Sequence, residues 1–223
     1  VRTEAHSGSP ASLILAAAAE WQPDLLVIGS PGRTGLVKLL LGSVSQKVLH
    51  QAPCPVRVAR GGATLPATPI KIIVGLDGSA GAEAAAQAVA QRTWPAQTEV
   101  VLISVVPQIP LVSSSQVAMP MSQWFMEERA RVQDSATKLA EELRSTGLNV
   151  SALLKEGEPK SCLLDEAERL SADCIFVGAA GINAIDRLLL GSVSGTVAAR
   201  ATCSVEIVRA SNAQALQAAA SAV

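Results

Sequence analysis

The chain has 223 residues and a mass of 22.9 kDa, which is room for one large domain or two small ones. Hydrophobic residues make up 49% and the mean hydropathy is +0.34, so a large core is expected and disorder is not. Aromatic residues make up 2%, and 18 basic against 19 acidic residues give a net charge of −1. Because nucleic-acid binding draws on aromatic faces or an excess of positive charge, the composition argues against it.

The cysteines and histidines give no sign of metal or redox chemistry. Four cysteines are widely spaced without a CxxC pair, and the two histidines are His6 and His50. No apolar run reaches the roughly 18 residues that span a bilayer, and the first residues are polar, without a signal segment. We therefore expect a cytoplasmic protein with reduced thiols and no membrane segment in this chain. The first residue is not methionine, which suggests a start inside a longer gene product.

An internal repeat organises the chain. Residues 1–60 align without a gap with residues 150–209, at a constant offset of 149, and 21 of the 60 pairs are identical. Residues 70–149 precede the second block and have no counterpart before the first. The repeat therefore predicts the back half of one unit followed by a complete second unit. The expected parts are residues 1–61, a linker at 62–69, residues 70–210 and an alanine-rich tail at 211–223.

The complete unit alternates strands with helices. Strands are expected at the short apolar runs, which are residues 71–76, 99–106, 149–154, 173–178 and 203–208. Helices are expected at residues 80–91, 123–146, 159–170 and 192–201, and the proline- and serine-rich residues 107–122 are expected to form a loop. Since helical crossovers join parallel strands, this order predicts a doubly wound α/β fold. It would have a five-stranded parallel sheet with helices on both faces.

Two strand ends of this unit carry residues that suit a ligand, because open α/β sheets bind ligands at the carboxyl ends of their strands. The first strand ends at Asp77. The fourth ends in Gly178 and Gly181, and nine residues later Gly191 and Ser192 begin a helix, a G-x2-G-x9-G-S spacing. Glycines allow close approach of the backbone, and a helix start offers unpaired N–H groups and a partial positive charge, which suits a phosphate. The hydroxyls of Ser192 and Ser194 would add donors.

For a single copy, a simple strand-to-helix turn explains this spacing equally well. The spacing occurs twice, however, because the first block repeats it at Gly29, Gly32, Gly42 and Ser43. With VGLDGS at residues 74–79 and the endings CPVRVAR and CSVEIVR, the chain resembles the ATP-binding branch of the universal stress protein family. The resemblance covers residues 1–61 and 70–210.

The resemblance implies a nucleotide site in the complete unit. Asp77 would contact the adenosine part, Gly75 would line the adenine pocket, and Val105 would contact adenine through its backbone. Ribose and phosphates would be held by the glycine loop and the helix start, at Val177, Gly178, Gly181, Gly191, Ser192, Val193 and Ser194. The implied ligand is ATP, accompanied by Mg²⁺, although no motif in the sequence indicates the ion independently.

The first block would form a partial phosphate site. It keeps Gly29, Gly32, Gly42, Ser43, Val44 and Ser45 but has no counterpart of Asp77 and no first or second strand. The resemblance also implies antiparallel pairing of the last strands. The two edges, Pro55–Ala59 and Ser204–Val208, would join in an intramolecular pseudo-dimer or support a homo-oligomer.

The function that we expect is a nucleotide-responsive stress or signalling module rather than a catalyst. One alternative is a slow ATPase, for which Asp186 and Arg187 are the charges near the motif and no base is assigned. Another is a nucleotide-free regulatory or interaction domain of a larger protein, such as a transporter.

Overall fold

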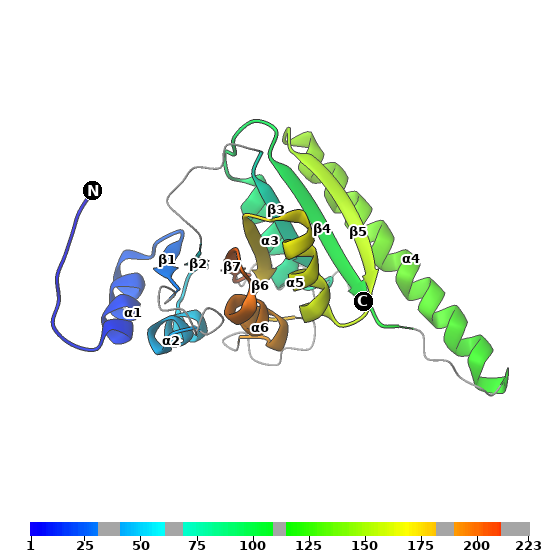
Figure 1. Cartoon of the computed structure of the whole chain (residues 1–223), viewed down its shortest axis with the longest axis horizontal. Helices are drawn as coiled ribbons and strands as arrows, with labels where there is room; N and C mark the ends of the chain where they lie inside the picture. Colours follow the sequence, from blue (N-terminus) through cyan, green and yellow to red (C-terminus); the bar gives the residue numbers. More distant parts are fainter. Residues whose placement is uncertain (31–40, 61–68, 109–114, 182–189, 211–223) are drawn as a thin grey trace.

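The computed structural model describes residues 1–30, 41–60, 69–108, 115–181 and 190–210, and Figure 1 shows how their helices and strands are arranged. The strands of these residues are β1 (Leu26–Gly29), β2 (Val56–Ala59), β3 (Lys71–Leu76), β4 (Glu99–Val106), β5 (Asn149–Glu156), β6 (Cys174–Gly178) and β7 (Ser204–Val208). The helices are α1 (Pro10–Trp21), α2 (Ser43–Gln51), α3 (Ala80–Ala90), α4 (Ser115–Ser145), α5 (Pro159–Leu170) and α6 (Ser192–Arg200).

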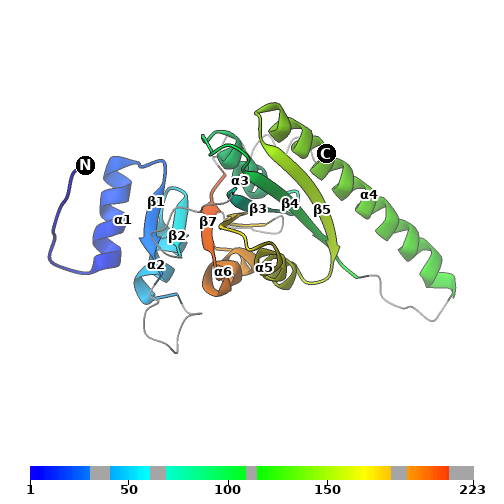
Figure 2. The same ribbon diagram turned by 45° about the horizontal axis from the view of Figure 1, so that its top comes forward.

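All the strands belong to one sheet, in the order β1-β2-β7-β6-β3-β4-β5. The five strands from β7 to β5 are parallel to one another, as helical crossovers require. This is the expected α/β fold, with a mainly parallel sheet and helices packed on it. Strands β1 and β2 are parallel to each other and extend the sheet beyond the five predicted strands. Figure 2 shows where they join it, at the antiparallel contact between β2 and β7.

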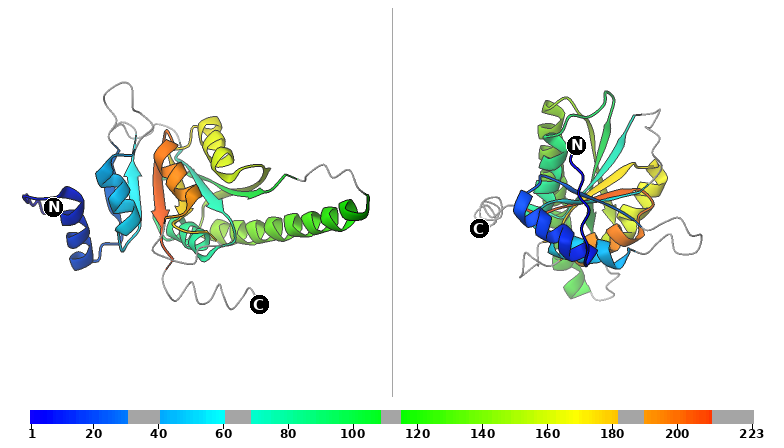
Figure 3. Two further views of the ribbon diagram at one scale, coloured as in Figure 1. Left: turned by 90° about the horizontal axis from the view of Figure 1, so that it is seen from below. Right: turned by 90° about the vertical axis from the view of Figure 1, so that its left-hand side faces the viewer.

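Helices cover both faces of the sheet (Figure 3). On one face, α3 and α4 bury a cluster that includes Ile72, Leu102 and Phe176 of the strands and Ala85 and Leu143 of the helices. The small side chains of the alanine-rich α3 let it pack close to β6. The remaining helices α1, α2, α5 and α6 cover the opposite face.

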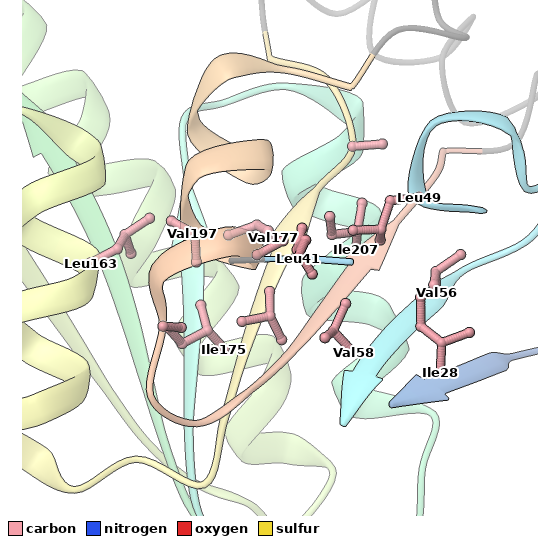
Figure 4. Close-up of a cluster of buried hydrophobic side chains, with 14 of the residues drawn as sticks. Ile28, Leu41, Leu49, Val56, Val58, Leu163, Ile175, Val177, Val197 and Ile207 are labelled. Atoms are coloured by element: carbon pink, nitrogen blue, oxygen red, sulfur yellow. The ribbon is translucent and has the colours of Figure 1, made fainter. Parts of the chain in front are cut away.

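The core on this second face is continuous across the β2–β7 contact. Figure 4 shows Leu163 of α5, Val197 of α6, Ile207 of β7, Val58 of β2 and Leu49 of α2 in one cluster. Each buried aliphatic side chain contributes about 1.5–3 kcal/mol to stability relative to an exposed one. Residues 1–60, the first segment, therefore share a core with residues 70–209, the second segment.

Helix α4 is longer than the sequence predicts. It begins at Ser115, whereas we expected a loop over residues 107–122 and a helix from residue 123. The prediction was wrong because it weighed Pro120 and the nearby serines above the run Gln116–Met119, whose residues tolerate helical conformation. The helix extends past the sheet at its N-terminal end (Figure 3).

Some sequence predictions fall outside the described residues. They are the expected linker apart from its last residue, the alanine-rich tail, Gly32, Asp186 and Arg187. Of the helices that the structure does describe, none is both long and apolar enough to cross a bilayer.

Candidate functional site

A cavity of about 470 Å³ lies at the carboxyl ends of β3, β4 and β6. The chain runs from β3 outward to β4 on one side and returns to β6 on the other, so the cavity sits where the strand order reverses. Such a switch point is the usual ligand site of a doubly wound sheet. All ten residues predicted for the site of the complete unit line this one cavity: Gly75, Asp77, Val105, Val177, Gly178, Gly181, Gly191, Ser192, Val193 and Ser194.

Asp77 forms one side of the cavity. It follows β3, and its Oδ1 accepts hydrogen bonds from the backbone N–H of Ser79 at 3.0 Å and from the Ser79 hydroxyl at 2.6 Å. Ser79 also caps α3 by accepting from the N–H of Ala82 at 3.2 Å. A Cβ at residue 181 would lie 2.7 Å from Asp77 Oδ2, so the carboxylate faces the glycine loop, where Gly181 leaves room for it.

The glycine loop, residues 178–181, lies next to Asp77 and forms a second side of the cavity together with the start of α6. A Cβ on Gly178 would lie 2.5 Å from the carbonyl carbon of Gly81, so a glycine is needed where β6 passes α3. Gly191 is the N-cap of α6, and its N–H donates to the carbonyl of Ala179 at 2.7 Å. The first N–H groups of a helix have no acceptor within it and carry a partial positive charge. In α6 these groups belong to Ser192, Val193 and Ser194.

The hydroxyl of Ser194 does not act as the sequence suggests. The residue is 3% exposed, and its Oγ lies 2.8 Å from the carbonyl oxygen of Ala179 and 3.1 Å from that of Gly191, both of which accept hydrogen bonds. This hydroxyl fixes the loop to the helix start. Ser192 is exposed, so it is the serine whose hydroxyl suits a ligand contact.

An apolar wall completes the cavity. Ile103 and Val105 of β4, Val177 of β6, and Pro159 and Leu163 of α5 line it. A Cβ on Gly75 would lie 3.1 Å from Val177 Cγ1 and 3.2 Å from Leu163 Cδ1, so the glycine keeps this part of the cavity open.

Seven lining residues were missed by the sequence prediction: Leu76, Ser79, Ala82, Ile103, Pro159, Leu163 and Ala180. Alternation along β4 was a usable signal for Ile103, because residues two apart share a face of a strand. Pro159 and Leu163 had no such signal, since they reach the cavity from a helix that the sequence alone does not place.

The lining is nearly uncharged. Asp77 is the one ionisable side chain among the described residues of the lining. Across the described part of the chain, His, Cys, Asp and Glu nowhere gather in a group that could ligate a metal on its own.

Burial raises the pKa of Cys174 to about 12 and that of Cys203 to about 11, so these thiols stay protonated at neutral pH.

The first segment repeats the helix start without the cavity wall. Gly42 is the N-cap of α2, Ser43, Val44 and Ser45 form its first turn, and Ser45 Oγ donates to the carbonyl of Gly29 at 3.2 Å. Gly32 lies outside the described residues. Because β1 is the edge of the described sheet, no described strand stands beside it as β3 stands beside β6.

The sheet order and the glycine-lined cavity at its switch point place the chain among doubly wound α/β proteins. The sequence profile described as "Universal stress protein family" matches residues 1–60 and 70–209. The chain therefore belongs to the universal stress protein family.

Individual relatives agree with this assignment. The chain is 29% identical over 214 residues to a universal stress protein of Mycolicibacterium smegmatis, covering 94% of this chain and 69% of that one. Other mycobacterial relatives are matched over 63% of their length, so the chain spans about two thirds of these proteins. Among solved structures, universal stress protein UspA from Lactobacillus plantarum is 26% identical, with a TM-score of 0.55 over 65% of this chain and 100% of that one. A universal stress protein from Archaeoglobus fulgidus shares the fold, with 23% identity and a TM-score of 0.62 over 92% of this chain and 67% of that one.

Proposed function

We propose that the second segment binds ATP in the cavity between β3, β4 and β6. The chain would act as a nucleotide-responsive module of the stress response rather than as a catalyst. The observation that carries the proposal is the arrangement of the cavity. Asp77, the adjacent Gly181 and the start of α6 line one space together with an apolar wall.

The start of α6 supports binding of the phosphates. Backbone N–H groups at a helix start, together with the helix dipole, favour an anion without any lysine. Gly178 and Gly181 allow the loop to approach a ligand closely, and Ser192 adds an exposed hydroxyl. We assign Ser194 a positioning role, because its hydroxyl is bonded to Ala179 and Gly191.

The apolar wall supports binding of the adenine ring. Val105, Val177 and Leu163 offer aliphatic surface to a flat aromatic base, and Gly75 keeps the space between them free. Asp77 would accept a hydrogen bond from the ribose side. A cavity that is mostly apolar, with few polar groups at one end, is typical of small-molecule sites.

A magnesium ion fits this site as a companion of the nucleotide. Mg²⁺ usually retains several waters and is held by one or two carboxylates together with the phosphates of the ligand. Because Asp77 is assigned to the ribose, the phosphates and waters would hold the ion. When bound, the ion would neutralise part of the triphosphate charge, while the N–H groups of Ser192 to Ser194 and the glycine loop orient the phosphates.

The lining supports retention of ATP better than its turnover. Phosphoryl transfer requires groups that stabilise charge and position water. The described lining residues include no lysine, arginine or histidine, and Oδ1 of Asp77 is already bonded to Ser79. Nucleotide occupancy would then act by favouring the conformation or association state that binds ATP better.

We further propose a tandem organisation for the chain, with a back half-unit at residues 1–61, a complete unit at residues 70–210 and pairing between them through β2 and β7. The first segment would offer a partial phosphate site at most. A cytoplasmic location remains part of this proposal.

The test is a titration of labelled ATP with Mg²⁺ against the whole chain and two variants. Gly181→Val places a side chain against Asp77 and the loop, and should weaken binding at least about tenfold, the effect of losing one hydrogen bond to a charged group. Gly29→Val is the matched control, because no atom of the described residues lies within 4 Å of a Cβ at residue 29. Its affinity should equal that of the unmodified chain.

Equal affinity in all three proteins would remove the glycine loop from the proposed site. A single-turnover assay on the bound complex separates retention from catalysis. ATP should stay intact for hours, and rapid release of phosphate would favour the ATPase alternative.

A further inference from the structure

The contact between β2 and β7 is symmetric in sequence. The Cα partners are Val56 with Ile207, Arg57 with Glu206 and Val58 with Val205. The internal repeat relates each residue of the first segment to the residue 149 positions later, so residue 57 is equivalent to residue 206. The central pair of the contact therefore joins the two equivalent positions of the repeat, and a pseudo-two-fold axis passes through it.

Contacts away from the axis obey this symmetry. Arg60 donates from Nη2 to the carbonyl of Ala198, near the C-terminal end of α6. Its equivalent, Arg209, donates from Nη2 to the carbonyl of Leu49 at 2.7 Å, near the C-terminal end of α2. A cation at a helix C-terminus is favourable in both places. Since the repeat places Leu49 on Ala198, these contacts would form equally well between two identical strands.

The central pair breaks the symmetry, because one segment supplies an arginine and the other a glutamate. Glu206 has no exposed side-chain surface, and its Oε2 accepts from Arg57 Nε at 2.9 Å and from Arg57 Nη2 at 2.7 Å. Arg92 adds bonds of 2.7 Å to Oε2 and 2.5 Å to Oε1. Both guanidinium groups stack over Phe176, with Cζ atoms 5.7 and 5.4 Å from the ring centre.

We propose that the Arg57–Glu206 pair selects the partner of each strand. It makes β7 pair with a strand that carries arginine at the central position, as β2 does, in preference to β7 of a second chain. This inference is independent of the proposed nucleotide binding.

Each pairing of like strands loses the central interaction. Two β7 strands in the same register would place Glu206 against Glu206 in a buried position, and each would keep Arg92 but lose Arg57. Two β2 strands would place Arg57 against Arg57. Leaving a buried charge without its partner is strongly unfavourable, so the mixed pair is preferred.

A second contact near the axis favours the mixed pair over two β2 strands. Ser204 Oγ accepts from the N–H of Arg60 at 3.1 Å and lies 3.1 Å from the Arg60 carbonyl, to which it donates. The position equivalent to Ser204 is Pro55, whose side chain has no polar group. The β2–β2 pair would lose this contact as well.

Charge reversals at residues 57 and 206 of the whole chain reproduce the central pair of each alternative pairing of strands. Arg57→Glu creates the glutamate pair of two β7 strands, Glu206→Arg creates the arginine pair of two β2 strands, and the double variant restores opposite charges in reverse. Lys47→Glu is the control, since it reverses a charge at an exposed position of the first segment. Amide hydrogen exchange of β2 and β7 reports their separation, and exchange of β4 and β5 reports the fold of the second segment.

Each single reversal should accelerate exchange in β2 and β7 at least about 100-fold, because it removes one partner of a buried ion pair and puts a like charge in its place. The double variant should exchange at least about tenfold more slowly than either single variant, and Lys47→Glu should match the unmodified chain. The proposal is overturned if Arg57→Glu exchanges like Lys47→Glu, or if the double variant is no slower than the single ones.

If a charge reversal also accelerates amide exchange in β4, the test uses Arg57→Met instead of the reversal. Methionine keeps an aliphatic stem over Phe176 and removes the charge. Exchange in β2 and β7 should rise about tenfold with β4 unchanged, as expected for loss of a charged hydrogen bond. No rise in this variant would equally overturn the proposal.

Discussion

The two segments begin their last helix in the same way, yet one has a cavity beside it and the other has a sheet edge. Gly42 and Gly191 have φ of −65° and −64° and the same ψ of 157°. Around them the packing differs: a Cβ on Gly178 would collide with α3, whereas a Cβ on its equivalent Gly29 would have no atom of the described part of the chain within 4 Å. The repeated block thus specifies the turn locally, and the cavity depends on the strands and helices that stand next to it.

The largest difference in stability between the two segments is expected for glycine-to-alanine substitutions at these equivalent positions. Gly178→Ala forces backbone atoms of β6 and α3 apart and should cost about 3 kcal/mol of unfolding free energy. Gly29→Ala should change stability by less than about 0.5 kcal/mol, because a Cβ there would meet no atom of the residues that the structure describes. Urea denaturation of both variants measures the difference. Similar losses would mean that the glycine is required by the turn itself and not by α3.

The serines of the first helical turn should behave more alike. Ser194 and Ser45 each donate to a carbonyl at or next to the end of the preceding strand, at 2.8 Å and 3.2 Å. Ser194→Ala should lose about 1–1.5 kcal/mol, and Ser45→Ala about 0.5–1 kcal/mol, because its bond is longer. The same denaturation experiment measures both. A larger loss at Ser45 would contradict the expectation that the shorter hydrogen bond, at Ser194, stabilises more.

A smaller difference between the two segments is expected in how their stability depends on pH. Burial alone would raise the pKa of Glu166, but hydrogen bonds from Lys155 and Arg169 outweigh it and hold the pKa below its usual value of 4.5. A lowered pKa in the folded state contributes stability above pH 4.5 that is lost as the pH falls through the folded-state pKa. The equivalent residue in the first segment is Ala17, so this contribution belongs to the second segment.

Glu166→Gln should therefore be less stable than the unmodified chain at pH 7, by about 1 kcal/mol, since both cationic partners are partly exposed and screened by solvent. The difference should shrink below pH 4.5. Urea denaturation at pH 7, 5 and 3.5 tests this. A difference that persists unchanged at the lowest pH would mean that packing, and not charge, explains the effect of Glu166.

The sequence predicted much of the second segment, because its pattern was local and doubled. Buried strands such as Lys71–Leu76, the helix start at Gly191 and Ser192 and the residues at the strand ends follow from neighbouring residues. The contacts of individual side chains between distant parts of the chain were beyond it. Leu163 reaches the cavity through the placement of α5, and Glu206 meets Arg57 and Arg92 through sheet pairing and the packing of α3.

Local composition misled the prediction of where α4 begins, and residue type misled the prediction of what the hydroxyl of Ser194 contacts. The start of α4 at Ser115 was hidden by prolines and serines that are typical of loops. At Ser194, the sequence indicates a hydroxyl at a helix start but not its direction. Tertiary packing turns that hydroxyl back toward Ala179 instead of leaving it for a ligand.

The number of nucleotides bound per chain tests the central claim most directly. Native mass spectrometry of the whole chain, at the lowest ATP concentration that fills its site in the presence of Mg²⁺, should show one nucleotide per chain. Gly181→Val should lower this occupancy, and Gly29→Val should leave it unchanged. Two nucleotides per chain would mean that the helix start alone makes a site. No bound nucleotide, or one that Gly181→Val leaves untouched, would contradict the assignment of the cavity.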